Sequence, residues 1–260
     1  AIKIHRTLFR TMLERLSRGR TLKRKLPAPF KRLPIYVSPE AGLRYWLRMS
    51  KVDPVLYRMC LELVSHGACV WDIGANNGLF SFCASTLAGE NGFVLAIEPD
   101  ISLARLIHKS AQLWLRRKYP TAPVSVLCSA VSDEPGIKLL QIAERARAAN
   151  YLKDSTGSSQ SGGARTEQAS VAVTLDDLLK CFRPPSILKI DVETHETRVL
   201  RGAAELLRVH RPTIWCEVSP ENCKPVFELL TLAGYDLFNA ESKERLTGGN
   251  ANWNTLAIPR

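Results

Sequence analysis

Residues 68–100 constrain the fold more than any other part of the chain. Cys69–Ile73 is a run of apolar residues with a single acid, which is typical of a strand buried on both faces of a parallel sheet. A turn bracketed by glycines and an apolar segment of helical length, 79–87, follow this run. A second apolar run, Phe93–Ile97, then ends at Glu98. The order of strand, glycine turn, helix, strand and acid predicts a nucleotide-binding βαβ unit.

The turn in this unit indicates which ligand it binds. Its spacing, from Gly74 to Gly78, has neither the G-x-G-x-x-G pattern of dinucleotide sites nor the Gly-Lys-Ser/Thr of phosphate-binding loops. Asp72 would repel a pyrophosphate but attract an ammonium group, and Glu98 can hold a ribose diol. S-adenosylmethionine carries both groups, so we predict it as the cofactor. The alternative is a unit whose glycines serve packing only, which would leave both acids without a purpose.

The predicted cofactor contacts come from three places in the chain. Most belong to the first strand and the turn, one ends the second strand, and one follows a third apolar run at 124–131, where it would meet the adenine. They are Asp72, Gly74, Ala75, Asn76, Gly78, Glu98 and Ser132.

Two blocks of sequence resemble one known family. The first reads DIGANNGLFS from Asp72, and the second reads ILKIDVETHE from Ile187, followed by VLRGA and RPTIWCE. Together they resemble the FkbM-type family of S-adenosylmethionine-dependent methyltransferases, over residues 53–239. The resemblance implies a Rossmann-like methyltransferase sheet and methylation of a hydroxyl on a sugar or small natural product. Thr194 departs from the pattern, because the family usually has glycine after Asp-Val-Glu.

The second block supplies the candidate catalytic residues. Lys189 lies in an apolar run, 186–192, where a lysine is costly unless it is paired, and strand alternation places it on the same side as Asp191. Asp191 ends this strand at the sheet edge where ligands bind in open parallel sheets. We predict Asp191 as the base or orienting carboxylate, His195 as a further proton acceptor and Lys189 as a third catalytic residue. The candidate substrate residues are Glu193, Glu196 and Glu217.

Each candidate also has a purely structural interpretation. Lys189 can form an ion pair below the site, His195 can be an exposed side chain, and acids in a first helical turn are favoured by the helix dipole. Asp191, Glu193 and Glu217 could instead hold Mg²⁺, which would lower the pKa of an acceptor hydroxyl. Nothing in their spacing decides this, so we assign no metal ligands.

The positive charge is concentrated near the N-terminus. Residues 1–32 contain eleven Lys or Arg and one acid, and the whole chain has a net charge of +11, so the remainder is nearly neutral. A basic amphipathic helix can bind an anionic membrane surface or a nucleic acid. The alternative is an extension with a solvated face and no binding partner. The neutral remainder disfavours nucleic acid. The apolar residues at helical spacing are Ile4, Leu8, Met12, Leu13 and Leu16.

We predict two regions in the chain. Residues 1–39 form the basic arm and a proline-rich connector, and residues 40–260 form an α/β domain with a doubly wound, mostly parallel seven-stranded sheet. The polar segment 143–170 predicts a flexible insertion near the site, in which Asn150 and Tyr151 are best suited to contact a polyol. Further strands are expected at 137–142, 171–174, 186–192, 213–218, 235–239 and 254–258, the last two as an antiparallel pair.

The cysteine content indicates the cellular compartment, but the composition does not exclude other functions. The seven cysteines are scattered without a C-x-x-C pair, which indicates a reducing cytoplasm and neither a disulfide framework nor a zinc site. The partners we expect are a small-molecule or glycan acceptor and, through residues 1–32, the surface of an anionic membrane. A nucleic-acid methyltransferase guided by the arm, a non-catalytic cofactor-binding protein and a nicotinamide-dependent oxidoreductase remain alternatives.

Overall fold

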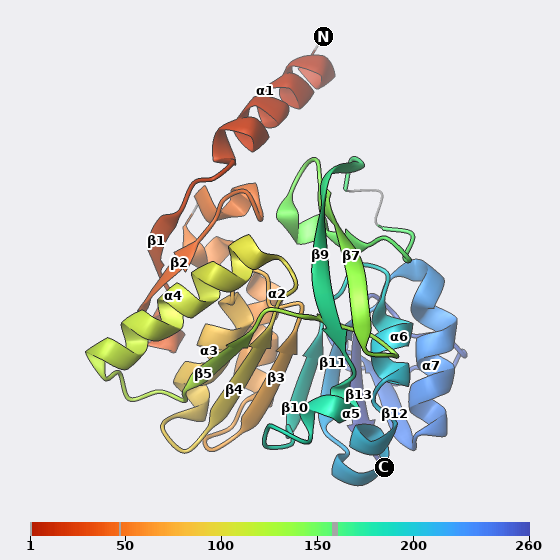
Figure 1. Ribbon diagram of the computed structural model, residues 1–260. Helices are drawn as coiled ribbons and strands as arrows, with labels where there is room; N and C mark the ends of the chain where they lie inside the picture. Colours follow the sequence, from red (N-terminus) through yellow and green to blue (C-terminus); the bar gives the residue numbers. More distant parts are fainter. Residues whose placement is uncertain (1, 47, 158–160) are drawn as a thin grey trace.

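A seven-stranded sheet forms the centre of the computed structural model, which describes residues 2–46, 48–157 and 161–260 (Figure 1). Every strand is parallel to its neighbours except β13, which runs antiparallel to both β11 and β12. This confirms the predicted doubly wound sheet and its antiparallel last pair. In spatial order the strands are β12 (Tyr235–Asn239), β13 (Asn254–Pro259), β11 (Thr213–Glu217), β10 (Ile187–Ile190), β3 (Cys69–Ile73), β4 (Phe93–Ile97) and β5 (Val124–Leu127).

Helices cover both faces of the sheet because successive strand residues point to opposite faces. In β3, Val70 packs into the core beneath α2 and α3, while Trp71 packs into the core beneath α6 and α7. The first face carries α2 (Pro54–Leu63), α3 (Leu79–Ala88) and α4 (Ile101–Arg117). The second carries α5 (Leu175–Leu178), α6 (Glu196–Arg201), the π-helical turn η5 (Leu206–His210) and α7 (Cys223–Leu232).

The N-terminal region contains a folded hairpin where a connector was predicted. Strand β1 (Leu22–Lys25) pairs antiparallel with β2 (Pro34–Val37), and a 3-10 turn, η1 (Ala28–Phe30), lies between them. Phe30 and Ile35 are fully buried in the core under α2 and α3. Residues 22–37 are therefore continuous with the domain. Helix α1 (Ile2–Ser17) precedes the hairpin, as the helical spacing predicted, and projects from the body (Figure 1).

A small second sheet stands beside the carboxyl ends of the central strands (Figure 1). Its order is β6 (Ala130–Val131), β9 (Ala164–Val173), β7 (Gly136–Ala143) and β8 (Tyr151–Leu152). Strand β9 begins at Ala164, so part of the predicted flexible insertion is a strand paired with β7. Residues 158–160 of that insertion lie outside the described residues, and its flexibility stays a prediction.

Short helical turns complete the described chain. They are η2 (Leu43–Trp46), η3 (Met49–Lys51), η4 (Arg147–Ala149) and η6 (Pro220–Asn222). Within the described ranges, no helix combines the length and the apolar character needed to cross a membrane.

Candidate active site

A cavity of about 640 Å³ lies at the carboxyl ends of β3, β4, β10 and β11. Its walls come from the β3–α3 turn, the segment 39–53, the ends of β10 and β11 and the small β7–β9 sheet, with Arg10 and Glu14 of α1 at one side. Open parallel sheets bind ligands at this edge, and the volume is within the range of sites that enclose small molecules. The cavity is therefore the candidate active site.

The β3–α3 turn forms one wall of the cavity and is held by backbone contacts. Gly74 has φ +76°, and a Cβ there would lie 1.9 Å from the carbonyl oxygen of Asp191. The amides of Gly74 and Ala75 both donate to the carbonyl oxygen of Ile97. Gly74, Ala75 and Asn76 line the cavity. Gly78 does not line the cavity. A Cβ there would lie 3.0 Å from Phe82, so the role of Gly78 in the structure is helix packing.

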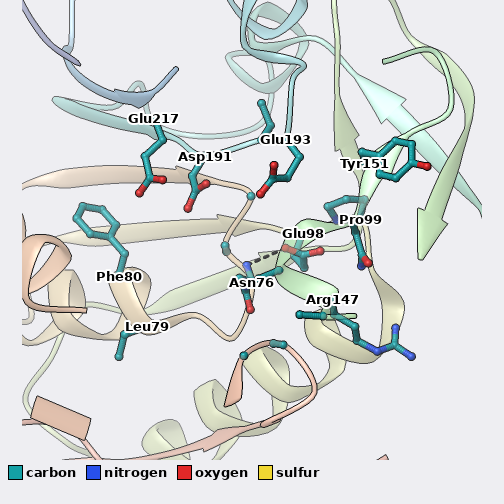
Figure 2. A pocket seen from close by; sticks show the side chains of 18 of the residues that line it. Asn76, Leu79, Phe80, Glu98, Pro99, Arg147, Tyr151, Asp191, Glu193 and Glu217 are labelled. Carbon is teal, nitrogen blue, oxygen red and sulfur yellow. Dashed lines mark hydrogen bonds between the residues drawn. The ribbon is translucent and has the colours of Figure 1, made fainter. Parts of the chain in front are cut away.

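Glu98 lies across the cavity at the end of β4. Its two carboxylate oxygens accept hydrogen bonds from the backbone amides of Asn76, at 2.7 Å, and Asp100, at 2.9 Å (Figure 2). Burial, followed by the nearby charge of Asp100, raises the pKa of Glu98 from 4.5 to about 8. Each carboxylate oxygen can accept more than one hydrogen bond, so Glu98 can also receive donors from a ligand.

Asp72 does not line the cavity. Its side chain is fully buried, with Oδ2 accepting a hydrogen bond from Ser81 Oγ at 2.5 Å and Oδ1 lying 3.4 Å from Lys189 Nζ. The structure therefore gives this acid a partner within the protein. Its predicted contact with the cofactor ammonium stays a prediction.

Ser132 is likewise buried below the surface of the cavity. Its hydroxyl donates to Asp133 Oδ1 and forms a second hydrogen bond, of 3.0 Å, with His195 Nε2. Its predecessors Ser129, Ala130 and Val131 line the cavity in its place. Its predicted position beside the adenine also stays a prediction.

Lys189 is almost completely buried and joins two carboxylates. Its Nζ lies 3.0 Å from Asp191 Oδ2 and 3.4 Å from Asp72 Oδ1, and it faces the rings of Phe80 and Trp215 at 5.8 Å. Burial by itself would lower the pKa of Lys189, but the charges of Asp191 and Asp72 outweigh it and raise the pKa above its usual value. Lys189 is therefore charged, in agreement with the expectation that a lysine in this strand is paired.

Three carboxylates gather on one side of the cavity. Figure 2 shows Asp191, Glu193 and Glu217 side by side, opposite Glu98. The Asp191 side chain is 37% exposed, and Glu217 is half-buried. The charge of Asp191, followed by burial, raises the pKa of Glu217 to about 8. Asp53, which was not selected from the sequence, adds a fourth carboxylate to the same wall.

Asp53 has a separate structural role that the sequence did encode. Its side chain accepts a hydrogen bond from the Leu56 amide, and Pro54 opens helix α2 after it, which is an ordinary helix start. Burial raises its pKa. Only the fold shows that this N-cap also faces the cavity.

His195 and Glu196 differ in their relation to the cavity. His195 lines it but is only 3% exposed, so the interpretation of His195 as an exposed side chain is wrong. Burial lowers the pKa of His195 to about 4, which keeps the imidazole neutral at physiological pH. Glu196 lies outside the cavity and accepts hydrogen bonds from Ser219 and Asn222, so it joins α6 to the loop after β11.

Thr194 occupies a strained backbone position between these residues. Its φ is +62°, in the left-handed region that β-branched residues rarely adopt. The glycine usual in the resembled family would carry no such cost. The threonine hydroxyl accepts a hydrogen bond from the Gly157 amide at 3.0 Å, and this contact links the turn after β10 to the insertion.

A buried cluster of charges fixes the insertion beside the cavity. Arg147 lies 2.5 Å from Asp100 Oδ2 and 2.9 Å from Glu40 Oε1, and Asn150 Nδ2 donates to Asp100 at 2.8 Å. Arg165 also pairs with Glu40. Asp100 and Glu40 were not selected from the sequence because Arg147, which joins them, lies 47 positions beyond Asp100. Asn150 and Tyr151 line the cavity, as a contact with a polyol would require.

The residues present fit S-adenosylmethionine. The turn at 74–76, the acid Glu98 and the backbone at 129–131 all line one cavity. Asn76 Oδ1 is buried and has no hydrogen-bond partner among the described residues, so an acceptor there is available to a ligand. A carboxylate at the end of β4 suits the hydroxyls of a ribose. The predicted cofactor contacts at 74–76 and Glu98 therefore share one site, whereas Asp72, Gly78 and Ser132 lie behind its wall.

The carboxylates do not form a metal cluster. Across the described ranges, no group of three or more His, Cys, Asp or Glu side chains has the arrangement that could hold a metal ion. The alternative use of Asp191, Glu193 and Glu217 as Mg²⁺ ligands therefore has no geometric support from these residues.

Comparison with known proteins places the site within one family model. The model, described as Methyltransferase FkbM domain, matches residues 72–237. Solved structures similar to this chain include a precorrin-6Y C5,15-methyltransferase from Geobacter metallireducens, with 15% identity, a TM-score of 0.47, and 82% of this chain and 90% of that chain covered. They also include the methyltransferase FkbM from Methylobacillus flagellatus, with 12% identity, a TM-score of 0.46, and 88% and 56% covered. A search of curated proteins finds no match.

Proposed function

The chain belongs to the FkbM family of S-adenosylmethionine-dependent methyltransferases, and on this premise we propose that it methylates a hydroxyl group on a sugar or small natural product. The observation that carries the proposal is the position of Asp191. This carboxylate ends β10 inside the cavity, is partly exposed to it, and is held at 3.0 Å by a buried lysine. A hydroxyl is a weak nucleophile, and a positioned carboxylate can remove its proton.

In this proposal, some residues of the cavity bind the cofactor and others accept the proton of the acceptor. S-adenosylmethionine supplies an electrophilic methyl group when it is bound. The turn at 74–76 and Glu98 would bind and orient it through the Asn76 amide oxygen, which has no partner among the described residues, and the Glu98 carboxyl group. Asp191 would accept the proton of the acceptor hydroxyl, and Lys189 would hold this carboxylate in place by its hydrogen bond to Oδ2.

The neighbouring acids suit a polyhydroxylated acceptor. With a pKa of about 8, the Glu217 carboxyl group is mostly protonated at neutral pH, so it can donate a hydrogen bond to an acceptor oxygen. Tyr151 of the insertion also lines the cavity, on the side of Pro99 (Figure 2). His195 is neutral, and its low pKa makes it a weaker base than an ordinary histidine.

Replacement of Asp191 by asparagine tests the proposal. We expect Asp191→Asn to lower kcat by about 10²–10⁴-fold, the usual contribution of a general base, with the cofactor affinity unchanged. The matched control is Glu193→Gln, which removes a charge from the same wall and leaves the ion pair between Lys189 and Asp191 in place. Turnover by Asp191→Asn at the wild-type rate would remove Asp191 from the mechanism.

The nature of the acceptor atom needs a separate measurement. Extracts and glycans can be incubated with the enzyme and a cofactor that carries a ¹³C-labelled methyl group. We expect the label to appear at the NMR chemical shift of a methyl ether. A label confined to nitrogen or carbon would contradict O-methylation while leaving methyl transfer itself intact.

A further inference from the structure

We propose that the face formed by the β1–β2 hairpin and helix α4 docks on the surface of an anionic lipid membrane. This face is separate from the cavity, because none of its charged residues lines the candidate active site. The proposal concerns where the enzyme works and does not depend on which acceptor it methylates.

The face has a high density of one sign of charge. Residues 20–37 contain six Lys or Arg, residues 101–118 contain five, and neither range contains Asp or Glu. The eleven cations equal the net charge of the whole chain, so the remaining residues sum to zero. Ten of the eleven side chains are exposed: Arg20, Lys23, Lys25, Lys31, Arg32, Arg105, Lys109, Arg116, Arg117 and Lys118.

In the part of the chain that the structure describes, none of these cations has a carboxylate partner, whereas many cations in the rest of the protein do. Ion pairs with carboxylates occur in many other parts of the described chain, among them those of Arg58 in α2 and Arg260 at the C-terminus. No ion pair within the described ranges includes any of the eleven. Uncompensated like charges repel one another, so a face of this kind is complementary to an anionic partner.

The hairpin and α4 form one continuous surface. The Tyr36 amide donates to Ser110 Oγ, Trp114 Nε1 donates to the carbonyl oxygen of Pro34, and the Tyr36 ring lies beside the ammonium groups of Lys23 and Lys109. Figure 1 shows the two elements side by side at the edge of the molecule. The packing of the hairpin on α4 therefore brings most of these cations together, while Arg20 and Arg24 contact Trp46 and Tyr45 of η2.

Exposed apolar side chains favour a lipid partner over a nucleic acid. Leu115 is 76% exposed and directly precedes Arg116, and Ile101 at the other end of α4 is 63% exposed. Aliphatic side chains among cations gain free energy at the boundary between lipid headgroups and acyl chains, whereas phosphates in water offer them nothing comparable. Met12 and Leu16 on α1 are also about half exposed, next to this face along the chain.

Vesicle sedimentation with the full chain tests the proposal. The probe is a phosphatidylcholine vesicle with about 30% phosphatidylserine, at about 0.15 M salt, and the comparison is pure phosphatidylcholine. We expect binding to the anionic vesicles only. The triple variant Arg105→Gln, Lys109→Gln and Arg116→Gln should weaken this binding about 100-fold, given the attraction of each cation to an anionic surface.

The control removes the same charge from a different part of the surface. Arg201→Gln, Arg208→Gln and Lys224→Gln neutralise three exposed cations of α6, η5 and α7, and we expect vesicle binding within about twofold of wild type. Leu115→Ser should weaken vesicle binding without any change in charge. Circular dichroism would verify that all variants are folded, and each set of substitutions affects only exposed side chains.

Three results would overturn the proposal. The first is equal binding to both kinds of vesicle, and the second is equal loss of binding in the two triple variants. The third is tighter binding of duplex or single-stranded RNA than of anionic vesicles at the same salt concentration, together with loss of RNA binding in the α4 triple variant. That outcome would assign the face to a nucleic acid.

Discussion

Burial and neighbouring charges together determine the charge of single residues around the cavity. Lys189 remains charged because two carboxylates surround it, whereas His195 remains neutral because burial disfavours its charged form. Glu98 and Glu217 both have pKa values near 8, so they change charge within the physiological range. The charge of the cavity wall therefore depends on pH near neutrality.

Glu98 gives a pH dependence with a definite sign. Its pKa in the folded protein, about 8, exceeds the ordinary value of 4.5, so the folded state binds the proton more tightly than the unfolded state. The resulting stability is complete below pH 4.5 and is lost as the pH rises through 8. We expect Glu98→Gln to reduce the decline in unfolding free energy over this range by up to about 1.4 kcal/mol per pH unit.

Urea unfolding of the ligand-free protein at several pH values measures this effect. Glu217 contributes a decline of the same sign, so Glu98→Gln should flatten the curve only in part, and the double variant with Glu217→Gln should flatten it further. If the pH dependence of Glu98→Gln matched that of wild type, the raised pKa of Glu98 would be wrong.

The sequence was enough to place the acidic residues along their strands, but not to identify the side chains that they contact. Asp72, Glu98 and Asp191 were each identified at the end of an apolar run, where a local pattern is enough. The sequence could not show that Lys189, more than a hundred positions from Asp72, lies between it and Asp191. The pairing of β3 with β10 brings these charges together, and no local pattern encodes that pairing.

At the scale of whole elements, apolar runs determined which strands and helices could be predicted. The strands of the central sheet and helix α3 were predicted because their apolar patterns are local. The first half of β9 was missed because Arg165, Thr166 and Glu167 are polar, so this stretch has the sequence pattern of a loop. The β1–β2 hairpin was missed because its prolines suggested a connector and its stability depends on packing against distant α4.

The charge cluster around Arg147 should be important for the position of the insertion. Asp100 is fully buried, and Arg147 is its cationic partner. Removing one partner of a buried ion pair leaves an uncompensated charge, so we expect Arg147→Met to lower the unfolding free energy by about 3 kcal/mol. We also expect weaker binding of S-adenosylhomocysteine by calorimetry, because the Asp100 amide donates a hydrogen bond to Glu98.

An exposed ion pair of the same insertion provides the control. Lys153 and Glu167 lie 3.0 Å apart with side chains 62% and 40% exposed. Exposed pairs contribute little, so Lys153→Met should cost less than about 1 kcal/mol. Equal losses of stability in the two variants would show that the cluster around Arg147 has no special role.

At the scale of the whole molecule, the N-terminal region divides at a different place from the predicted boundary at residue 39. Helix α1 contacts the rest of the protein through a polar pair of Glu14 with Arg145, and Arg18, directly after the helix, pairs with Glu144. The hairpin instead contributes fully buried side chains, including Phe30 and Ile35, to the core. The part of the chain that packs into the domain core therefore begins near residue 20.

Two truncations test this division. Removal of residues 1–18 should leave a folded protein and cost about 1 kcal/mol, since polar pairs such as Arg18 with Glu144 are exposed and contribute little. Removal of residues 1–39 should prevent folding, because each large buried side chain contributes about 2–5 kcal/mol and the total stability of a domain is only about 5–15 kcal/mol. A cooperative thermal transition in the shorter protein would contradict this expectation.

The contact between Gly74 and the Asp191 carbonyl has a consequence for how such an enzyme can diversify. A Cβ at Gly74 would lie only 1.9 Å from the Asp191 carbonyl oxygen. A substitution at Gly74 would therefore displace the strand end that carries Asp191, the proposed base, and a shift of that strand end would displace the turn. The β3–α3 turn and the end of β10, which form the floor of the cavity, are thus expected to change only together. In the insertion and the segment before α2, the glycines Gly42, Gly157 and Gly162 approach only side chains, so we expect new acceptors to be accommodated by substitutions there.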